Sequence, residues 1–377
     1  MSPPINGVAT SITAFIGSAL RGPTELPGSV NSFAEFEQLY GGLWAPSSLG
    51  YAVQQFFLNG GGQALIVRVE GDGAGGITDA DIIASLPALD QADLFNLLCI
   101  PPLKRHGGDV GKPTWDAAIA YASSRRAFVI VDPAERWASA DDVLNAATGL
   151  TSVVTPDDNA AIYFPRILAS DPLHDGQTDS FAPGGTIAGV FAETDLNRGV
   201  WTAPAGLEAA MQGVLGLSLG GSASPGKLSD ADSGRLNLAA INSFRNVPTS
   251  GTVLWGARTL KGTDAQASDW KYIPVRRPAF YIEESVVRGI KWAAFEPNDQ
   301  ALWAQIQLSV NAFMHTLFTQ GAFQGTTPPQ AYFVKCDSTT TTPADMENGI
   351  VNVVIGFAPI RPAEFVMLTI QQTALVS

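Results

Sequence analysis

The sequence is poor in charged residues. Only 15% of its 377 residues are Asp, Glu, Lys or Arg, against about 25% in an average soluble domain. Hydrophobic residues make up 46% of the chain, and the mean hydropathy is +0.12. This composition favours a protein whose surface is partly covered by protein partners.

Basic residues and long apolar runs are also scarce. The chain has 22 Lys and Arg against 35 Asp and Glu, a net charge of −13, so it lacks the basic face that a nucleic-acid partner requires. Its longest apolar runs are shorter than the ~20 residues of a membrane span, and Met1–Gly7 has neither the basic nor the apolar region of a signal peptide. We therefore expect no nucleic-acid partner and no direct membrane insertion.

Cysteine and histidine are rare. The two cysteines, Cys99 and Cys336, lie in apolar strand-like runs, which favours buried free thiols over a disulfide. The three histidines, His106, His174 and His315, form no Cys/His cluster with metal-ligand spacing. The sequence predicts no metal site.

The length allows two or three domains. Up to residue 261, apolar runs alternate with helical patterns, which predicts an α/β domain with a mainly parallel sheet. The predicted strands are Val8–Ile16, Ala64–Val69, Leu94–Ile100, Ala127–Val131, Ala160–Phe164, Leu236–Ile241 and Thr252–Trp255. At the end of a predicted helix, Asp195 is expected to pair with Arg198. The polar segment 262–268 marks a domain boundary.

The residues after this boundary predict an α+β domain. A helix is predicted over Ile273–Lys291, with Pro278 setting its start. A second helix, Asp299–Gly321, is predicted to begin at a good N-cap residue, which is Asn298 or Asp299. Its apolar stripe consists of Leu302, Trp303, Ile306, Leu308, Val310, Phe313 and Leu317.

Two strands are predicted near the C-terminus. Ile350–Phe357 is apolar on both faces, which indicates a central strand covered on both sides. The last strand, Phe365–Gln371, also has two apolar faces, and Pro359 and Pro362 limit its folding back. Such a terminal strand suits the completion of a neighbour's sheet. We therefore predict an inter-subunit arm formed by Phe365, Val366, Met367, Leu368, Thr369 and Ile370.

One motif suggests a serine hydrolase. Gly216–Gly220 matches G-x-S-x-G with Ser218 as nucleophile. His315 follows, and the candidate acids are Asp264, Asp269 and Asp299. The nucleophile elbow requires a helix directly after the serine, but the loop-like Gly220–Gly226 follows, and His315 falls inside a predicted helix. A chance match is favoured, and no catalytic residue is predicted.

A second motif has the spacing of a dinucleotide-binding fingerprint. Gly71–Gly76 follows a predicted strand, with Asp90 and Asp93 near the position of a ribose-binding acid. Glu70 and Asp72 would repel a pyrophosphate, and the next helix starts only after Thr78. A flexible loop is favoured, and no cofactor is predicted.

Long runs in the C-terminal third resemble contractile tail sheath proteins, which form the sheaths of contractile phage tails, R-type bacteriocins and related contractile injection systems. Several runs in the same order are more specific than any short motif. The runs are Tyr281–Ser285, Trp292–Asp299, Leu302–Ala304, Phe323–Gly325, Ala331–Asp337, Asn348–Ile350 and Gly356–Phe365, and the likeness extends to Ser11–Val69 and Gly185–Pro204.

The resemblance implies a structural subunit and not an enzyme. Such subunits polymerise helically, as stacked hexameric rings, around an inner tube, and contraction drives the tube through a target envelope. The implied partners are further copies of the chain, the inner tube protein, and baseplate and terminal cap proteins. The implied location is the bacterial cytoplasm during assembly, then a phage tail or an extracellular or cell-borne injection particle. Another structural component of the same machine is the second alternative, although Glu296–Ala304 looks like sheath.

The resemblance also implies a domain plan. Residues 10–261 would form an outer α/β domain of subtilisin-like topology, and residues 262–377 an inner domain with a linking arm at 364–377. Many family members carry a longer leader, so residues 1–9 are expected to be a shortened N-terminal arm. Family members contact the tube through the inner domain. We therefore expect Gln305, Gln307 and Asn311 to face the tube and to bind it by hydrogen bonds more than by charge.

Overall fold

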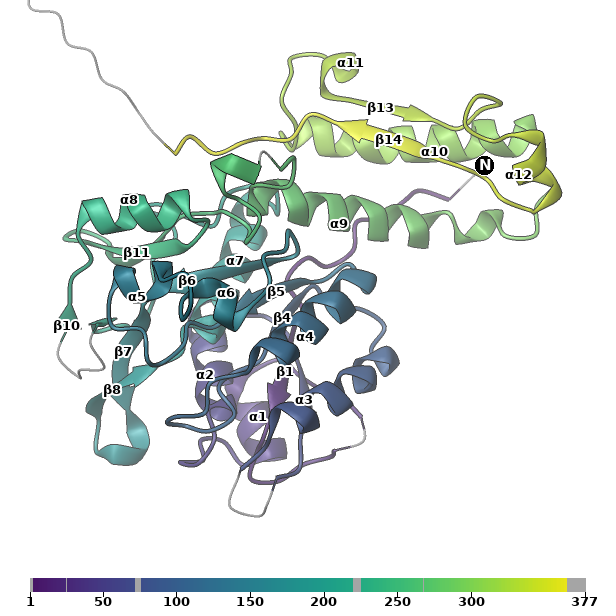
Figure 1. Ribbon diagram of the computed structural model, residues 1–377. Coiled ribbons are helices and arrows are strands. Elements are labelled where there is room, and N and C mark those ends of the chain that lie inside the picture. Colours follow the sequence, from purple (N-terminus) through teal and green to yellow (C-terminus); the bar gives the residue numbers. More distant parts are fainter. Residues whose placement is uncertain (1–2, 25, 72–75, 220–224, 267, 365–377) are drawn as a thin grey trace, which may run out of the picture.

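The computed structural model describes residues 3–24, 26–71, 76–219, 225–266 and 268–364. These residues form an α/β part and an elongated extension built on two long helices (Figure 1). The extension projects from one end of the α/β part and carries the last strands of the described chain.

The centre of the α/β part is an eight-stranded sheet of order β12-β11-β6-β5-β4-β1-β3-β2. The six strands from β11 to β3 are parallel, and the edge strands β2 and β12 are antiparallel to their neighbours, so the predicted mainly parallel sheet is confirmed. Central strands such as β5 are buried at every position, as expected for a sheet covered on both faces. Its strands are β1 Thr13–Gly17, β2 Gly28–Val30, β3 Ala64–Arg68, β4 Leu97–Cys99, β5 Phe128–Val131, β6 Ala160–Phe164, β11 Asn242–Val247 and β12 Gly251–Trp255.

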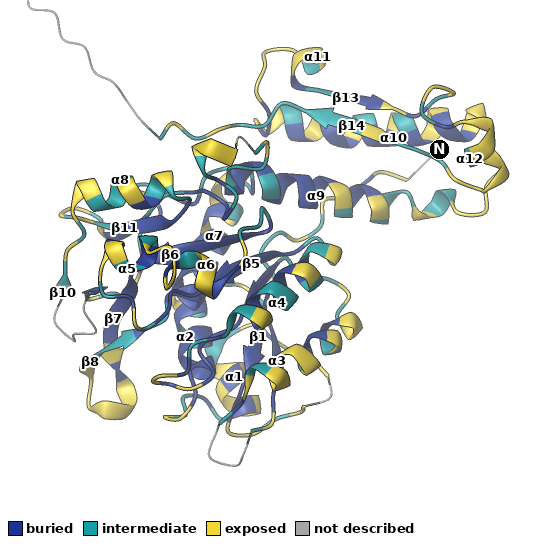
Figure 2. Cartoon of the chain, in the orientation of Figure 1, coloured by how far each residue is buried: buried dark blue, intermediate teal, exposed yellow. Residues whose placement is uncertain are grey.

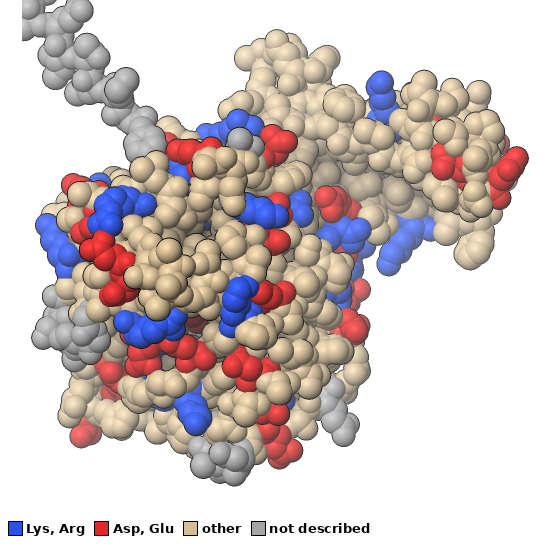
Figure 3. Space-filling model, viewed as in Figure 1, with Lys and Arg blue, Asp and Glu red and all other residues tan. Residues whose placement is uncertain are grey.

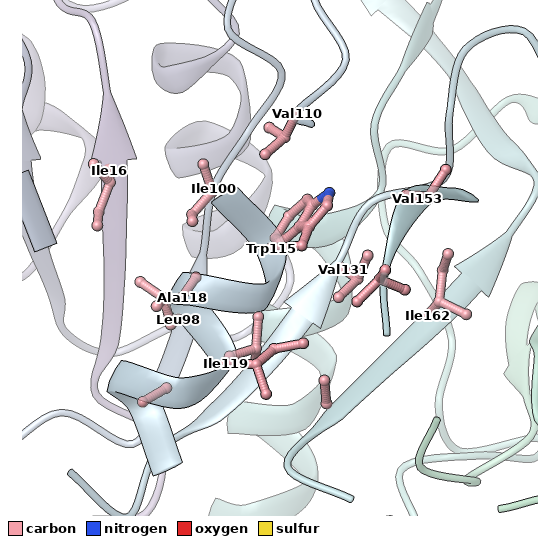
Figure 4. Close-up of a cluster of buried hydrophobic side chains, with 14 of the residues drawn as sticks. Ile16, Leu98, Ile100, Val110, Trp115, Ala118, Ile119, Val131, Val153 and Ile162 are labelled. Carbon is pink, nitrogen blue, oxygen red and sulfur yellow. The ribbon is translucent and has the colours of Figure 1, made fainter. Parts of the chain in front are cut away.

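Helices cover the sheet on both sides. One core lies under α3 and α4, where Trp115 of α4 packs over Ile100 and Val131 (Figure 4). The other lies under α1, α2 and α7 and contains Phe56 and Ile187. Figure 2 shows these layers as the continuous buried centre. The helices are α1 Phe33–Tyr40, α2 Leu49–Leu58, α3 Asp79–Ser85, α4 Lys112–Ser124, α5 Ala140–Leu144, α6 Leu150–Val153, α7 Gly184–Arg198 and α8 Asp230–Leu238, with short 3-10 turns at η1 Leu86–Gln91 and η2 Pro172–His174.

A smaller antiparallel sheet of order β10-β9-β7-β8 extends the α/β part. It consists of β7 Arg166–Asp171, β8 Gln177–Phe181, β9 Gly216–Ser218 and β10 Pro225–Gly226. The predicted strand Leu236–Ile241 is wrong, because most of it lies in α8 or in the turn that follows. The decisive local signal is Ser229, whose hydroxyl accepts a hydrogen bond from Asp232 N and caps α8.

The extension follows η3 Asp264–Gln266. In chain order it consists of α9 Ile273–Gly289, η4 Lys291–Ala293, α10 Gln300–Thr319, α11 Pro328–Ala331, β13 Tyr332–Lys335, α12 Pro343–Glu347 and β14 Val354–Phe357. Of the two predicted N-cap residues, Asp299 caps α10, accepting from Leu302 N at 2.9 Å. Leu308 is 68% exposed and does not belong to the buried stripe. Pro278 does not set the start of α9; the helix begins at Ile273 with Pro274 in its first turn, where the missing N–H is harmless.

The predicted central strand Ile350–Phe357 is wrong in its environment. β14 begins only at Val354 and pairs with β13 in a two-stranded sheet that packs against α10. Ile350 and Val354 are each 45% exposed. The segment is apolar as predicted, but within the described residues no second layer covers the outer face of this sheet.

Candidate assembly surfaces

A buried ion pair joins the extension to the α/β part. Arg277 of α9 and Asp195 of α7 have side chains only 4% and 2% exposed, and the guanidinium donates to both carboxylate oxygens at 3.0 and 2.6 Å. Burial raises the pKa of Asp195, although Arg277 opposes this. The predicted pair of Asp195 with Arg198 is wrong, because the last turn of α7 faces α9 and Arg198 pairs with Glu208.

The N-terminal residues lie along α9. Val8 N donates to Ser285 Oγ at 3.1 Å, and Thr10 O accepts from Arg277 at 2.8 Å. Ile5 is buried in the core of the extension with Ile282 and Val286. The first described residues therefore belong to the extension, although they precede β1 in the sequence.

A second buried arginine fixes the end of the described chain. Arg258 is fully buried, and its Nε and Nη2 donate to the two oxygens of Glu364 at 2.6 Å each. Tyr272 OH donates to the same carboxylate at 3.0 Å. Burial disfavours the charged form of Glu364, but the bonds and charge of Arg258 outweigh it and lower the pKa of this carboxyl. The predicted arm residues Phe365 to Ile370 lie outside the described residues.

The two-stranded sheet presents open edges. β13 and β14 are paired from Tyr332 with Phe357 to Lys335 with Val354. Within the described residues neither strand has a second neighbour in its sheet. On β13, however, Tyr332 N donates to Pro328 O and Val334 O accepts from Gln307, so β14 offers the more open edge to another strand.

The predicted tube-facing residues do not share one surface. Gln305 is exposed, but Gln307 is half-buried and donates to Val334 O at 3.0 Å, and Asn311 is also half-buried. The exposed face of α10 has no Asp, Glu, Lys or Arg, and consists of Gln300, Ala301, Ala304, Gln305, Leu308, Ala312, His315, Thr316 and Thr319. The neighbours of Leu308 at i−4, i−3 and i+4, which are Ala304, Gln305 and Ala312, are the sequence signal for this face. The prediction that Leu308 lies in the buried stripe is wrong.

The hydrolase residues are not brought together. Ser218 is 5% exposed at the end of β9, opposite Arg166 and Pro225, whereas His315 lies on the exposed face of α10. The next described element after Ser218 is the strand β10, where an elbow needs a helix. Of the candidate acids, Asp264 pairs with Lys271 and Asp299 caps α10.

The glycine motif gives no cofactor site. Residues 72–75 lie outside the described part of the chain. Thr78 caps α3 beyond the glycines, as predicted. Asp90 accepts from Tyr121 OH at 2.7 Å, and Asp93 pairs with Arg288 at 2.6 Å, so both acids already have protein partners.

The described ranges also show no metal cluster and no membrane-spanning helix. No group of three or more His, Cys, Asp or Glu residues there is arranged to hold a metal ion. No helix in the described part of the chain has the length and apolar character of a membrane span. Cys99 and Cys336 are both buried and free.

Comparison with known sequences points to one protein class. Residues 265–373 match the phage tail sheath C-terminal domain family. A protein of Pseudomonas aeruginosa (strain UCBPP-PA14), described as a prophage major tail sheath protein, is 28% identical over 181 residues. That alignment spans 47% of this chain and 42% of the relative, so the chain matches less than half of the relative's length.

Solved structures match over nearly the whole chain. The contracted PVC sheath complex of an extracellular contractile injection system gives a TM-score of 0.77 at 27% identity, covering 98% of this chain and 94% of that one. The contracted helical sheath of the anti-feeding prophage gives 0.77 at 25% identity, covering 99% and 96%. A sheath tail protein of Listeria innocua, 10% identical with a TM-score of 0.62 over 94% and 96%, shares the fold. The chain is thus similar to tail sheath proteins, and its residues 265–373 match the phage tail sheath C-terminal domain family.

Proposed function

We propose that this chain is the structural subunit of a contractile sheath, which polymerises helically around an inner tube and contracts to drive the tube through a target envelope. The observation that carries the proposal is the match to a contracted sheath subunit over 98% of the chain. The proposed partners are further copies in stacked hexameric rings, the inner tube protein, the baseplate and terminal caps. Assembly would take place in the bacterial cytoplasm, and the particle would be a phage tail or an extracellular or cell-borne injector.

The domain plan of 1–9, 10–261 and 262–377 is part of the proposal, with a subtilisin-like topology for the outer domain. The parallel sheet and its covering helices support an outer domain ending near β12. The separate core of the extension, which includes Ile306 and Val310 of α10, supports an inner domain. The pair Arg277–Asp195 would hold the two in register.

Strand addition would link the subunits. The arm 364–377, through Phe365 to Ile370, would pair with an open edge of β13–β14 in a neighbouring copy. The two-stranded sheet supports this, because isolated pairs of strands are only marginally stable in water. The half-exposed apolar residues Ile350 and Val354 would gain a covering layer in the polymer.

The tube would be contacted by the exposed face of α10. Gln305 and Leu308 are at its centre, and Asn311 lies at its border. Gln307, already bonded to Val334 O, would contribute less than its neighbours. The face has no residue with a permanent charge. On the side of the extension that carries β13 and β14, Figure 3 likewise shows few charged side chains along its middle. The contact would therefore rest on hydrogen bonds and apolar packing.

Electron microscopy of the purified full-length chain tests this proposal. Regular hollow cylinders are expected, together with no hydrolysis of small esters. Uniform monomers with esterase activity would instead favour the Ser218 hydrolase. That alternative is the weaker one, because Ser218 is buried and His315 is on another part of the molecule.

A further inference from the structure

The turn between α9 and α10 presents an aromatic ring to solvent. Phe295 is fully exposed, at 107% of its reference area, and the next most exposed of the described large apolar residues, Leu196, is at 80%. An exposed phenyl ring forgoes the free energy that its burial would provide. Phe295 therefore contributes little to the packing of its own subunit.

The backbone of this turn is unfavourable for phenylalanine. Glu296 N donates to Ala293 O at 3.2 Å, Ala294 has φ −63° and ψ 131°, and Phe295 has φ +72°. These values describe a type II turn with Phe at the position that glycine normally occupies. A positive φ costs free energy in a bulky residue. The isolated subunit gains nothing from either feature, which indicates a contact with another molecule.

A cavity that suits a phenyl ring lies at the other end of the extension. Its volume is about 190 Å³, and a cavity of roughly 150 Å³ binds benzene. Trp255 supplies an aromatic wall for ring packing. We call this cavity the socket; its apolar and small lining residues include Ala203, Ala205, Gly206, Trp255, Ala257 and Pro362, and the polar Asn237 and Glu364 also line it.

Phe295 cannot reach the socket of its own chain. The socket also includes Glu364, which is bonded to Tyr272, the residue before α9. Phe295 follows the far end of α9, and 17 helical residues span about 25 Å. Figure 1 shows the turn at the end of the extension remote from the α/β part.

We propose that Phe295 of one copy inserts into the socket of a second copy. The inference rests on the proposed function, since it requires a chain that self-assembles. It joins two different surfaces from opposite ends of the extension, so the contact is heterologous. Heterologous contacts generate rings or helices rather than closed two-fold dimers, and a helical sheath requires such contacts.

The first test removes the ring or blocks the socket. Phe295→Gly takes away the side chain and suits the positive φ, so the melting temperature should stay unchanged or rise, while the yield of sedimenting cylinders should fall at least tenfold. Ala205→Phe, which fills the socket from within, should have the same effect, and Phe295→Leu should retain part of the yield. Leu173→Ala, at an exposed apolar residue of η2, is the matched control and should assemble normally. Wild-type yields from folded Phe295→Gly would overturn the insertion.

The second test detects the contact while leaving Phe295 and the socket intact. Glu296→Cys stands beside the ring, and Leu207→Cys stands beside Gly206 at an exposed position. Both native cysteines are buried, so a short bis-maleimide should react at the engineered thiols. Mixed cylinders of the two single variants should give a cross-linked dimer that neither variant gives alone.

The outcomes separate the two proposals. No cylinders from the wild-type chain would count against the sheath function itself. Mixed cylinders without a cross-link would leave the sheath function standing and would overturn the insertion of Phe295.

Discussion

At the scale of single residues, the described chain contains a buried carboxyl group that has no basic side chain at hydrogen-bond distance. Asp132 follows β5, and its Oδ1 accepts from Gly184 N at 2.8 Å. Burial raises the pKa of Asp132 to about 7, against the opposing charge of Arg166. The folded protein therefore keeps a proton on Asp132 at pH values where the unfolded chain has lost it.

This difference predicts a pH-dependent stability. Because the folded-state pKa lies above the unfolded value of 3.8, the contribution of Asp132 to stability is greatest below pH 4 and declines as the pH rises to 7. The pKa difference corresponds to at most roughly 4 kcal/mol. Asp132→Asn keeps the acceptor for Gly184 N and should raise the free energy of unfolding by about 1–3 kcal/mol at pH 8 with little change at pH 4. Urea unfolding at both pH values measures this; equal effects at the two would contradict it.

The pair of Arg258 with Glu364 has the opposite pH dependence. Its lowered pKa means that Glu364 contributes stability above the unfolded-state pKa, and that this contribution is lost as the pH falls through the folded-state pKa. Glu364→Gln should cost about 1–3 kcal/mol at pH 7, because it weakens bonds to a fully buried guanidinium. The loss should shrink at pH 3. The matched control is Glu347→Gln in α12, an exposed position that should leave the unfolding curve unchanged.

At the scale of elements, the open sheet β13–β14 predicts the effect of removing the proposed arm. Deleting residues 364–377 would also remove the carboxylate that binds Nε and Nη2 of Arg258, so the sharper variant ends after Glu364 and keeps that pair. This deletion should fold and melt like the full chain but should form no long cylinders, because no strand would complete the neighbour's sheet. Val366→Asp should weaken assembly less completely.

Sedimentation, negative-stain imaging and thermal melting distinguish the outcomes of this deletion. Cylinders of normal length would contradict the arm. A deletion that fails to fold would show that the segment belongs to the core of its own subunit.

The exposed face of α10 predicts how salt affects binding to the tube. Because its residues carry no permanent charge, the yield of co-assembly with the tube should change less than threefold between 50 and 500 mM NaCl. Over this range the Debye length falls from roughly 14 Å to below about 5 Å, so a contact between charges would weaken strongly. Leu308→Asp should reduce co-assembly strongly, whereas Lys335→Asp, on β13, should not. A steep salt dependence in the wild type would contradict a neutral contact.

At the scale of the whole molecule, the catalytic alternative gives a clear prediction. Ser218→Ala should leave melting temperature, cylinder formation and ester hydrolysis unchanged within error, because no base lies near the hydroxyl among the described residues and the substitution is small. Assays of wild type and variant on small esters measure this. Hydrolysis that is present in the wild type and lost in the variant would argue for an enzyme.

The sequence by itself determined the local elements and the protein class. The mainly parallel sheet follows from apolar runs alternating with helical patterns, and the caps Asp299 and Thr78 follow from side chains that bond to the first helical N–H groups. Runs such as Trp292–Asp299 carried the sheath resemblance without any structure. These features depend on neighbours in sequence, which a linear pattern contains.

Tertiary structure decided everything that depends on partners distant in sequence. Asp195 bonds Arg277 across 82 residues instead of the nearby Arg198, and Gln307 turns to Val334 O instead of outward. Ile350–Phe357 has the composition of a covered strand, yet the covering layer is absent from the described part of the single chain. An apolar run indicates that its burial is favourable. Which element covers it depends on how the subunit and its neighbours pack.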